Sequence, residues 1–264
     1  MHPTINEILR LTRKRILPLR NEEKKVIASR NFHDIIKARK QQNLIPVIAE
    51  VKPSSPAQFI RNVTPKDAAQ IAREMEAGGA SAISVLTEPQ FFKGSIENLV
   101  SVRQAVSVPV LRKDFIIDKA QICEADSDLI LLIAGILGDK LNDFVDESMS
   151  CGREPLVEVH NKKEVESALS THTGIIGINN RDLDTLEVDI TTTEKLAPLI
   201  SDRIIISESG ISTPEEAVRM IDAGVDAVLI GTSIMQGNIY DKTYELVHAL
   251  NSPDEKIKTA DKHR

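Results

Sequence analysis

The chain has 264 residues, of which 41% are hydrophobic and 27% are charged, and its formal net charge is −6. This is the composition of an ordinary globular protein, long enough for one large α/β domain or two small ones. The negative charge favours neither nucleic acid nor an anionic membrane surface as a partner, so any phosphate must be bound by local groups.

The chain shows no sign of a membrane segment, a secretory signal or a metal site. Its longest apolar run, residues 129–138, is about half of the ~20 residues that a transmembrane helix needs. The N-terminus is interrupted by charges and lacks an apolar signal segment. Cys123 and Cys151 are too few for a disulfide framework, and no CxxC motif or histidine cluster indicates zinc. We therefore expect a cytoplasmic protein without a metal.

Helical patterns come first along the chain, and strand patterns follow. Residues 1–43 contain no strand signal. Beyond them, eight short runs rich in apolar and β-branched residues recur, mostly separated by helical patterns that begin with Pro and end with Gly. The runs begin at residues 44, 81, 108, 128, 155, 174, 203 and 226. Because they are apolar at nearly every position, they indicate parallel strands covered on both faces.

Eight strand-and-helix units are the count of a (β/α)8 barrel, also called a TIM barrel. We predict one such domain over residues 1–250, in which residues 1–43 form a helical N-terminal extension. Residues 251–264 are charged and lack apolar periodicity, which predicts a flexible tail.

Polar and charged residues gather at the ends of the predicted strands, where the active site of this fold lies. These residues are Glu50, Lys52, Lys113, Glu158, Asn179, Arg181, Glu208 and Ser209. Alternation along a strand sends residues two apart to the same face. A single charge at a strand end is more often a solvated or paired group than a catalytic one. The convergence of three acids and two lysines from strands around the ring nevertheless indicates a catalytic site.

The last two predicted strands end in glycine-containing loops, ISESGIS and LIGTSI. In this fold, a phosphate site is often formed by the loops after the seventh and eighth strands. Gly210 and Gly231 are candidates for backbone contacts with a phosphate, with Thr232 as a hydroxyl donor and Lys52 as a counter-charge. The alternative is that both glycines only make tight turns.

A series of motifs carries a resemblance to a known family. In chain order they are IAEVKPSSP, SVLTEPQFFKGS, VPVLRKDFIID, LLIAGIL, LVEVHN, IGINNRDLDTLEVD, ISESGI and VLIGTSIM. This series resembles that of the indole-3-glycerol phosphate synthases of tryptophan biosynthesis, from about residue 30 to 245. The resemblance implies a (β/α)8 barrel whose N-terminal helical segment helps to cover the mouth.

The resemblance also implies a reaction and roles for several residues. The substrate 1-(2-carboxyphenylamino)-1-deoxyribulose 5-phosphate closes to indole-3-glycerol phosphate and releases carbon dioxide and water, without a metal or organic cofactor. By resemblance, Lys113 is the general acid and Glu158 the acid/base group of the dehydration. Lys52 and Glu50 are an adjacent pair that orients the substrate or shares proton transfer. Which lysine serves which step stays open.

The remaining predicted contacts also come from the resemblance. Four substrate-binding positions are Asn179, Arg181, Glu208 and Ser209. The phosphate-binding positions are Lys52, Ser55, Gly210, Gly231 and Thr232. The positions of the apolar pocket for the anthranilate ring are Phe92, Phe115 and Leu131. For the two phenylalanines, ordinary core packing is the alternative.

Two segments depart from the family pattern. The loop after the first strand reads PSSPAQFIRN instead of a run of small, basic and glycine residues, so its mobility can differ. The segment between the third and fourth strands is about three residues short, which predicts a third helix of about two turns.

Two alternative functions stay open beside this one. One is a non-catalytic phosphosugar-binding barrel. The other is a phosphoribosylanthranilate isomerase, which would need a Cys and an Asp at strand ends, whereas neither cysteine here ends a predicted strand. The sequence indicates no protein partner or oligomeric state.

Overall fold

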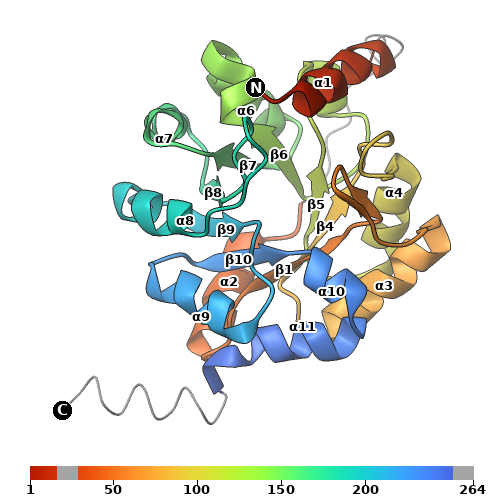
Figure 1. Cartoon of the computed structure of the whole chain (residues 1–264), viewed down its shortest axis with the longest axis vertical. Coiled ribbons are helices and arrows are strands. Elements are labelled where there is room, and N and C mark those ends of the chain that lie inside the picture. Colours follow the sequence, from red (N-terminus) through yellow and green to blue (C-terminus); the bar gives the residue numbers. More distant parts are fainter. Residues whose placement is uncertain (17–28, 252–264) are drawn as a thin grey trace.

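Eight parallel strands form a closed barrel in the computed structural model, which describes residues 1–16 and 29–251. Around the ring the strands follow the order β1-β10-β9-β8-β7-β6-β5-β4 (Figure 1). They are β1 (Val47–Val51), β4 (Ala82–Leu86), β5 (Val110–Lys113), β6 (Leu129–Ile133), β7 (Glu154–Val159), β8 (Ile175–Asn179), β9 (Ile204–Glu208) and β10 (Ala227–Ile230). The predicted (β/α)8 barrel and all eight predicted strands are confirmed.

Helices cover the outside of the barrel. They are α3 (Pro65–Ala77), α4 (Ile96–Ala105), α5 (Ala134–Leu137), α6 (Leu141–Ser150), α7 (Lys162–Leu169), α8 (Thr191–Leu196), α9 (Pro214–Asp222), α10 (Thr232–Gln236) and α11 (Ile239–Val247). Short 3-10 turns are η2 (Lys119–Gln121), η3 (Gly138–Lys140), η4 (Ala197–Leu199) and η5 (Ala249–Asn251). Thr64 and Thr213 begin α3 and α9 with reciprocal capping boxes, each followed by a proline. Among the described residues, no helix is long and apolar enough to span a bilayer.

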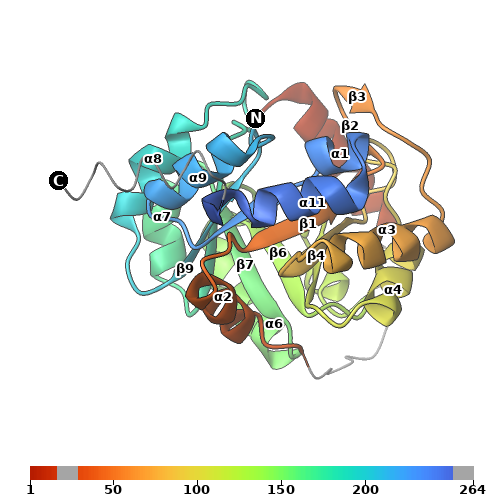
Figure 2. The same ribbon diagram turned by 90° about the horizontal axis from the view of Figure 1, so that it is seen from below.

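The described part of the N-terminal extension contains two helices, α1 (Pro3–Arg15) and α2 (Phe32–Gln41), at opposite ends of the barrel (Figure 2). At the carboxyl ends of the strands, the backbone N–H of His2 donates to the carbonyl of Leu183. At the amino ends, His33 lies 3.2 Å from Glu154 at the start of β7. The predicted helical extension is confirmed in its described part. Residues 17–28 and the predicted tail over 252–264 lie outside the described residues.

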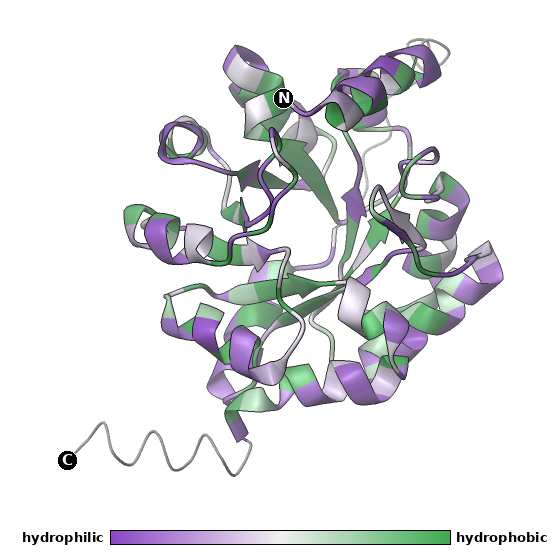
Figure 3. Cartoon of the chain, viewed as in Figure 1, coloured by the Kyte–Doolittle hydropathy of each residue, from purple (hydrophilic) through white to green (hydrophobic). Residues whose placement is uncertain are grey.

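Strand side chains alternate between two apolar layers. One set packs against the outer helices, and the other fills the barrel with residues such as Ile48, Leu111, Leu156 and Ile206. The strands are mostly hydrophobic in Figure 3, whereas the end of β5 is hydrophilic. Every second side chain of a strand points into the barrel. At the carboxyl ends of the strands, the residues that follow this inward-facing pattern are polar.

The connection from β5 to β6 is thinner than its neighbours. The sequence predicted a shortened helix of about two turns in this connection. The structure has a single 3-10 turn there, η2, so the helix is shortened as predicted, and by more than expected. Next to η2, Cys123 forms a disulfide with Cys151 at the end of α6, with their Cα atoms 6.6 Å apart. This is one bond rather than a framework, and it joins the thin connection to the neighbouring helix.

The first loop contains an element that the sequence did not indicate. It is a small antiparallel hairpin of β2 (Ser54–Ser55) and β3 (Gln58–Phe59), separate from the barrel sheet. The Oγ of Ser54 donates to the carbonyl of Gln58 at 3.2 Å. The altered loop is therefore folded back on itself at the mouth of the barrel.

Candidate active site

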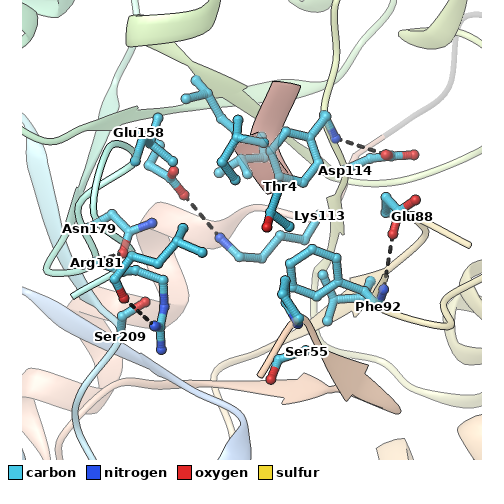
Figure 4. A pocket seen from close by; sticks show the side chains of 18 of the residues that line it. Thr4, Ser55, Glu88, Phe92, Lys113, Asp114, Glu158, Asn179, Arg181 and Ser209 are labelled. Atoms are coloured by element: carbon cyan, nitrogen blue, oxygen red, sulfur yellow. Dashed lines mark hydrogen bonds and ion pairs between the residues drawn. The ribbon is translucent and has the colours of Figure 1, made fainter. Parts of the chain in front are cut away.

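Lys113 lies in the centre of the barrel mouth, at the end of β5. Its Nζ donates to Oε2 of Glu158 at 3.1 Å and to Oε2 of Glu208 at 2.6 Å. The two carboxylates come from β7 and β9 and are almost completely buried. Figure 4 shows the lysine reaching across the pocket toward Glu158. The structure thus brings together charges that are 45 and 95 residues apart in sequence.

Glu50 and Lys52 form a second pair beside it. Glu50 lies on β1 and Lys52 directly follows the strand, two positions further on. Nζ of Lys52 lies 3.4 Å from Oε1 of Glu50. Small residues leave room for the acids. A Cβ atom at Gly231 would lie 2.7 Å from Oε1 of Glu50, and one at Gly177 would lie 2.2 Å from Oε1 of Glu208. Gly231, predicted as a phosphate contact, therefore also makes space for a carboxylate.

Burial and pairing set the charges of this cluster. Burial disfavours the ammonium, but Glu208, Glu158 and Glu50 outweigh it and raise the pKa of Lys113 above its usual range. Burial also opposes ionisation of Glu158, but Lys113 and His160 hold the pKa of Glu158 below its usual range. Glu208 differs, because burial and the neighbouring acids outweigh Lys113 and raise the pKa of Glu208 to about 7. The cluster therefore holds a protonated lysine at neutral pH.

Two chambers meet at this cluster. The first has a volume of about 400 Å³ and a mostly apolar wall. Among the predicted residues, its wall contains Glu50, Lys52, Ser55, Phe92, Lys113, Phe115, Leu131, Glu158, Asn179, Arg181 and Ser209. Phe92 and Phe115 lie with ring centroids 6.2 Å apart. We refer to this cavity as the apolar chamber.

The second chamber is more polar, with a volume of about 300 Å³. Its wall contains Glu50, Lys52, Lys113, Arg181, Glu208, Ser209, Gly210, Ser212, Gly231, Thr232 and Ser233. Gly210 has φ +81°, a left-handed conformation that glycine adopts without strain. We refer to this cavity as the polar chamber. The residues that both chambers share are Glu50, Lys52, Lys113, Arg181 and Ser209.

Every residue predicted for the site lines at least one of the two chambers, but one lies apart from its predicted group. Ser55 was predicted to contact phosphate together with Gly210 and Gly231. It lines the apolar chamber, whereas both glycines line the polar one. The hairpin turns Ser55 toward Gln58, whose carbonyl accepts from its Oγ at 3.4 Å. That Ser55 contacts the phosphate stays a prediction, and the position of Ser55 in the apolar chamber does not favour it.

Several residues of the apolar chamber were not identified from the sequence. His2, Thr4 and Ile5 reach it from α1, which the family resemblance placed near the mouth only as a segment. Glu88 also lines it, and its carboxylate accepts three backbone N–H bonds from residues 90–92, which shapes the loop that carries Phe92. Leu86 at the end of β4 also lines this chamber, and residues two apart along a strand point to the same side. This spacing is the signal in the sequence that would have indicated Glu88.

His160 was also not identified. It follows Glu158 at the same parity, and its Nε2 lies 3.3 Å from Oε1 of that acid. It lines neither chamber. Within the described part of the chain, no group of three or more His, Cys, Asp or Glu side chains is arranged to hold a metal ion.

The fold and the site together define an enzyme of the (β/α)8 barrel class, with its acids and lysines at the mouth. The sequence profile of the family described as indole-3-glycerol phosphate synthase matches residues 6–246. The chain belongs to this family. It is a carboxy-lyase of tryptophan biosynthesis that closes 1-(2-carboxyphenylamino)-1-deoxyribulose 5-phosphate to indole-3-glycerol phosphate.

Two relatives show how far the similarity extends. An indole-3-glycerol phosphate synthase of Halobacterium salinarum is 42% identical over 246 residues, which are 93% of this chain and 96% of the relative. That of Aquifex aeolicus is 45% identical over 238 residues, 87% of this chain and 91% of the relative. The alternative reading as a phosphoribosylanthranilate isomerase finds no support, and neither cysteine ends a strand.

Similar solved structures support the fold alone. An N-acetylmannosamine-6-phosphate 2-epimerase from Clostridium perfringens has a TM-score of 0.59 and 16% identity, over 83% of this chain and 98% of that chain. A (S)-3-O-geranylgeranylglyceryl phosphate synthase from Thermoplasma acidophilum has a TM-score of 0.59 and 14% identity, over 84% and 98% of the two chains.

Proposed function

We propose that the two chambers hold the two ends of the substrate, with the anthranilate ring in the apolar chamber and the phosphate in the polar chamber. The supporting observation is that Lys113 lines both. In the substrate, the ketone carbon lies between the ring and the phosphate. A substrate that spans both chambers therefore brings its ketone to the shared wall and to the lysine.

Lys113 acts as the general acid in this proposal. Its ammonium donates to the ketone oxygen while the ring carbon that carries the carboxylate attacks the ketone carbon. The new carbon–carbon bond forms, and loss of carbon dioxide restores the aromatic ring. The raised pKa of Lys113 keeps the proton in place at neutral pH until the oxyanion develops.

Glu158 serves the dehydration that follows. Its lowered pKa keeps it ionised, so it can accept the proton that the new five-membered ring loses as its double bond forms. One of the two lysine ammonium groups donates a proton to the hydroxyl group, which leaves as water. Lys52, beside Glu50, lines both chambers and orients the substrate or shares this proton transfer. We place Asn179, Arg181, Glu208 and Ser209 in contact with the body of the substrate.

The phosphate is bound, in this proposal, by the loops after β9 and β10. The backbone of Gly210 and Gly231 and the hydroxyl of Thr232 line the polar chamber, and Lys52 supplies the counter-charge. Phe92, Phe115 and Leu131 hold the ring on the other side. Neither step in this proposal needs a metal or an organic cofactor.

Incubation of the purified protein with the carboxyphenylamino-deoxyribulose phosphate tests this function, because indole formation is seen by fluorescence. Inorganic phosphate is expected to inhibit competitively. In a crystal soaked with phosphate, the anion is expected within hydrogen-bond reach of the amides of Gly210 and Gly231. A phosphate that fills another site while this one stays empty contradicts the chamber assignment, and absence of indole contradicts the function.

We also infer that the protein works in the cytoplasm on a small phosphorylated substrate, without nucleic acid or membrane partners. The acidic composition and the biosynthetic family support this inference. Fractionation of cells that express a tagged chain checks the location.

A further inference from the structure

A chain of alternating charges extends from the catalytic cluster toward the outside of the barrel. Glu158 contacts Lys113 through Oε2 and lies 3.3 Å from Nε2 of His160 through Oε1, an ion-pair distance without good hydrogen-bond alignment. The other imidazole nitrogen, Nδ1, lies 3.0 Å from Oε2 of Glu164. One buried imidazole therefore joins a carboxylate of the site to a carboxylate outside it.

Glu164 is fixed from several sides. It belongs to the first turn of α7, and its Oε2 accepts from the backbone N–H of His160 at 2.9 Å. Its Oε1 accepts from Nδ2 of Asn161 at 2.7 Å. On the other side, a Cβ atom at Gly135 would lie 2.8 Å from Oε1 of Glu164, so glycine allows this close approach. The carboxylate has little freedom, and it holds the imidazole in one orientation.

The imidazole is charged in this setting. Burial alone would lower the pKa of His160, but Glu158 and Glu164 outweigh it and raise that pKa to about 10. Other charges nearby are Asp182, in the loop after β8, and Lys113, on the far side of Glu158. His160 itself is almost fully buried and lies behind the wall of the chambers.

We propose that His160, held as an imidazolium between Glu158 and Glu164, is a positioning residue that keeps the carboxylate of Glu158 oriented and ionised during the reaction. The inference rests on the proposed role of Glu158 as the acid/base group. In this proposal, the orientation of Glu158 depends on a series of charged contacts, which we call the relay, from Glu158 through His160 to Glu164 of α7.

The proposal answers a difficulty in the reaction. Lys113 holds Glu158 in the free enzyme, but it turns its proton toward the substrate ketone when it acts as the acid. A buried carboxylate without a partner would then take up a proton and lose its function as a base. His160 stays in place throughout, because Glu164 and the backbone of α7 hold it.

Replacement of His160 by Gln tests the relay through activity. This variant keeps a donor of similar size but removes the charge. We expect kcat to fall by about 10–100-fold, as is typical when a group that orients a functional residue is lost. KM is expected to change by less than about threefold, because His160 does not line the chambers. His172→Gln is the matched control, since that side chain is 79% exposed and lines neither chamber.

Replacement of Glu164 by Gln tests the charge. Without its second carboxylate, His160 loses its proton at lower pH, so the alkaline limb of the pH profile of kcat moves down by about one unit or more from about 10. Imidazole 15N NMR, assigned with His160→Gln, reads the same charge directly. We expect a protonated His160 in the wild type at about pH 8, and a more neutral ring in Glu164→Gln. A loss of packing alone would change stability but not this profile.

The outcomes separate the relay from the function. If the wild type forms no indole, the proposed function fails, while NMR still reports whether His160 is an imidazolium. If the wild type is active, a neutral His160 at about pH 8 overturns the proposal. So does a folded His160→Gln variant whose kcat stays within about threefold of the wild type.

Discussion

Two clusters of buried charges are built on consecutive residues of β5, Arg112 and Lys113. The two side chains point to opposite faces of the strand, so each meets a different set of acids. Arg112 is completely buried and directs its nitrogens to the carbonyl of Gln121, to Thr87 and to two acids, Asp114 and Glu124. Asp114 in turn accepts two bonds of 2.9 Å from Arg15 of α1. We refer to this group as the structural cluster.

The catalytic cluster around Lys113 differs in two respects. Three carboxylates face the lysine, whereas Arg112 pairs with two. It also borders both chambers, whereas Arg112 lines neither. Pairing of buried charges is therefore common to structure and catalysis. The catalytic cluster is distinguished by three carboxylates around a lysine that borders both chambers.

The largest effect is expected for Lys113→Met. The replacement removes the acid but keeps the length of the side chain, so kcat is expected to fall by at least about a thousandfold. The Kd of a product analogue is expected to change by less than about tenfold, since the chambers remain. Lys113→Arg is not expected to rescue kcat, because the planar guanidinium fork does not present its protons to one oxygen as the ammonium does. More than a tenth of the wild-type kcat would make Lys113 a structural charge and Lys52 the acid to test.

Arg112→Met makes the same replacement one residue earlier and is expected to show the opposite result. It removes the Arg112 partner of Glu124 and one of the two guanidinium partners of Asp114, which costs about 3–5 kcal/mol of the free energy of unfolding. Urea denaturation measures this loss, and the protein that stays folded at low temperature is expected to keep most of its kcat. A fall in kcat comparable to that of Lys113→Met would show that the two clusters do not differ as described.

The pH dependence of stability is expected to differ between the clusters. Glu208 has a pKa raised to about 7, so the folded state binds its proton more tightly, and its contribution to stability falls as pH rises from about 4.5 to about 7. Asp114 has a pKa below its usual range, because Arg112 and Arg15 outweigh its burial. Its contribution is present at neutral pH and is lost only in acid. Urea titrations of Glu208→Gln and Asp114→Asn check these opposite signs, and equal pH profiles would contradict them.

The smallest effect concerns the thin connection beside the structural cluster. Between β5 and β6, η2 supplies few backbone hydrogen bonds, so amide exchange over residues 117–127 is expected to be faster than in the neighbouring connections. Reduction of the disulfide between Cys123 and Cys151 is expected to increase this exchange further. Uniform protection around the ring would show that Gln121 and the bond to α6 replace the missing helix fully.

Much of the site could be predicted because it depends on local periodicity. Glu50, Lys113, Glu158 and Glu208 continue the inward-facing series of their strands, and a period of two is visible in sequence. The order of the elements then determines that all these ends meet at one mouth. His160 obeys the same rule and was missed, because a histidine between a strand and a helix shows no sign of its partners.

The sequence by itself determined the eight strands, the helical extension and the polar ends of the strands, since each depends on neighbours along the chain. Closure of the barrel decided which charges meet. It brings Lys113 to Glu208 across 95 residues. The hairpin of β2 and β3 puts Ser55 in the apolar chamber, apart from Gly210 in the polar one. Closure of the barrel also gave Gly177 and Gly231 their role of leaving space for acids. Such contacts depend on strand register and packing across the ring, which no local pattern of residues specifies.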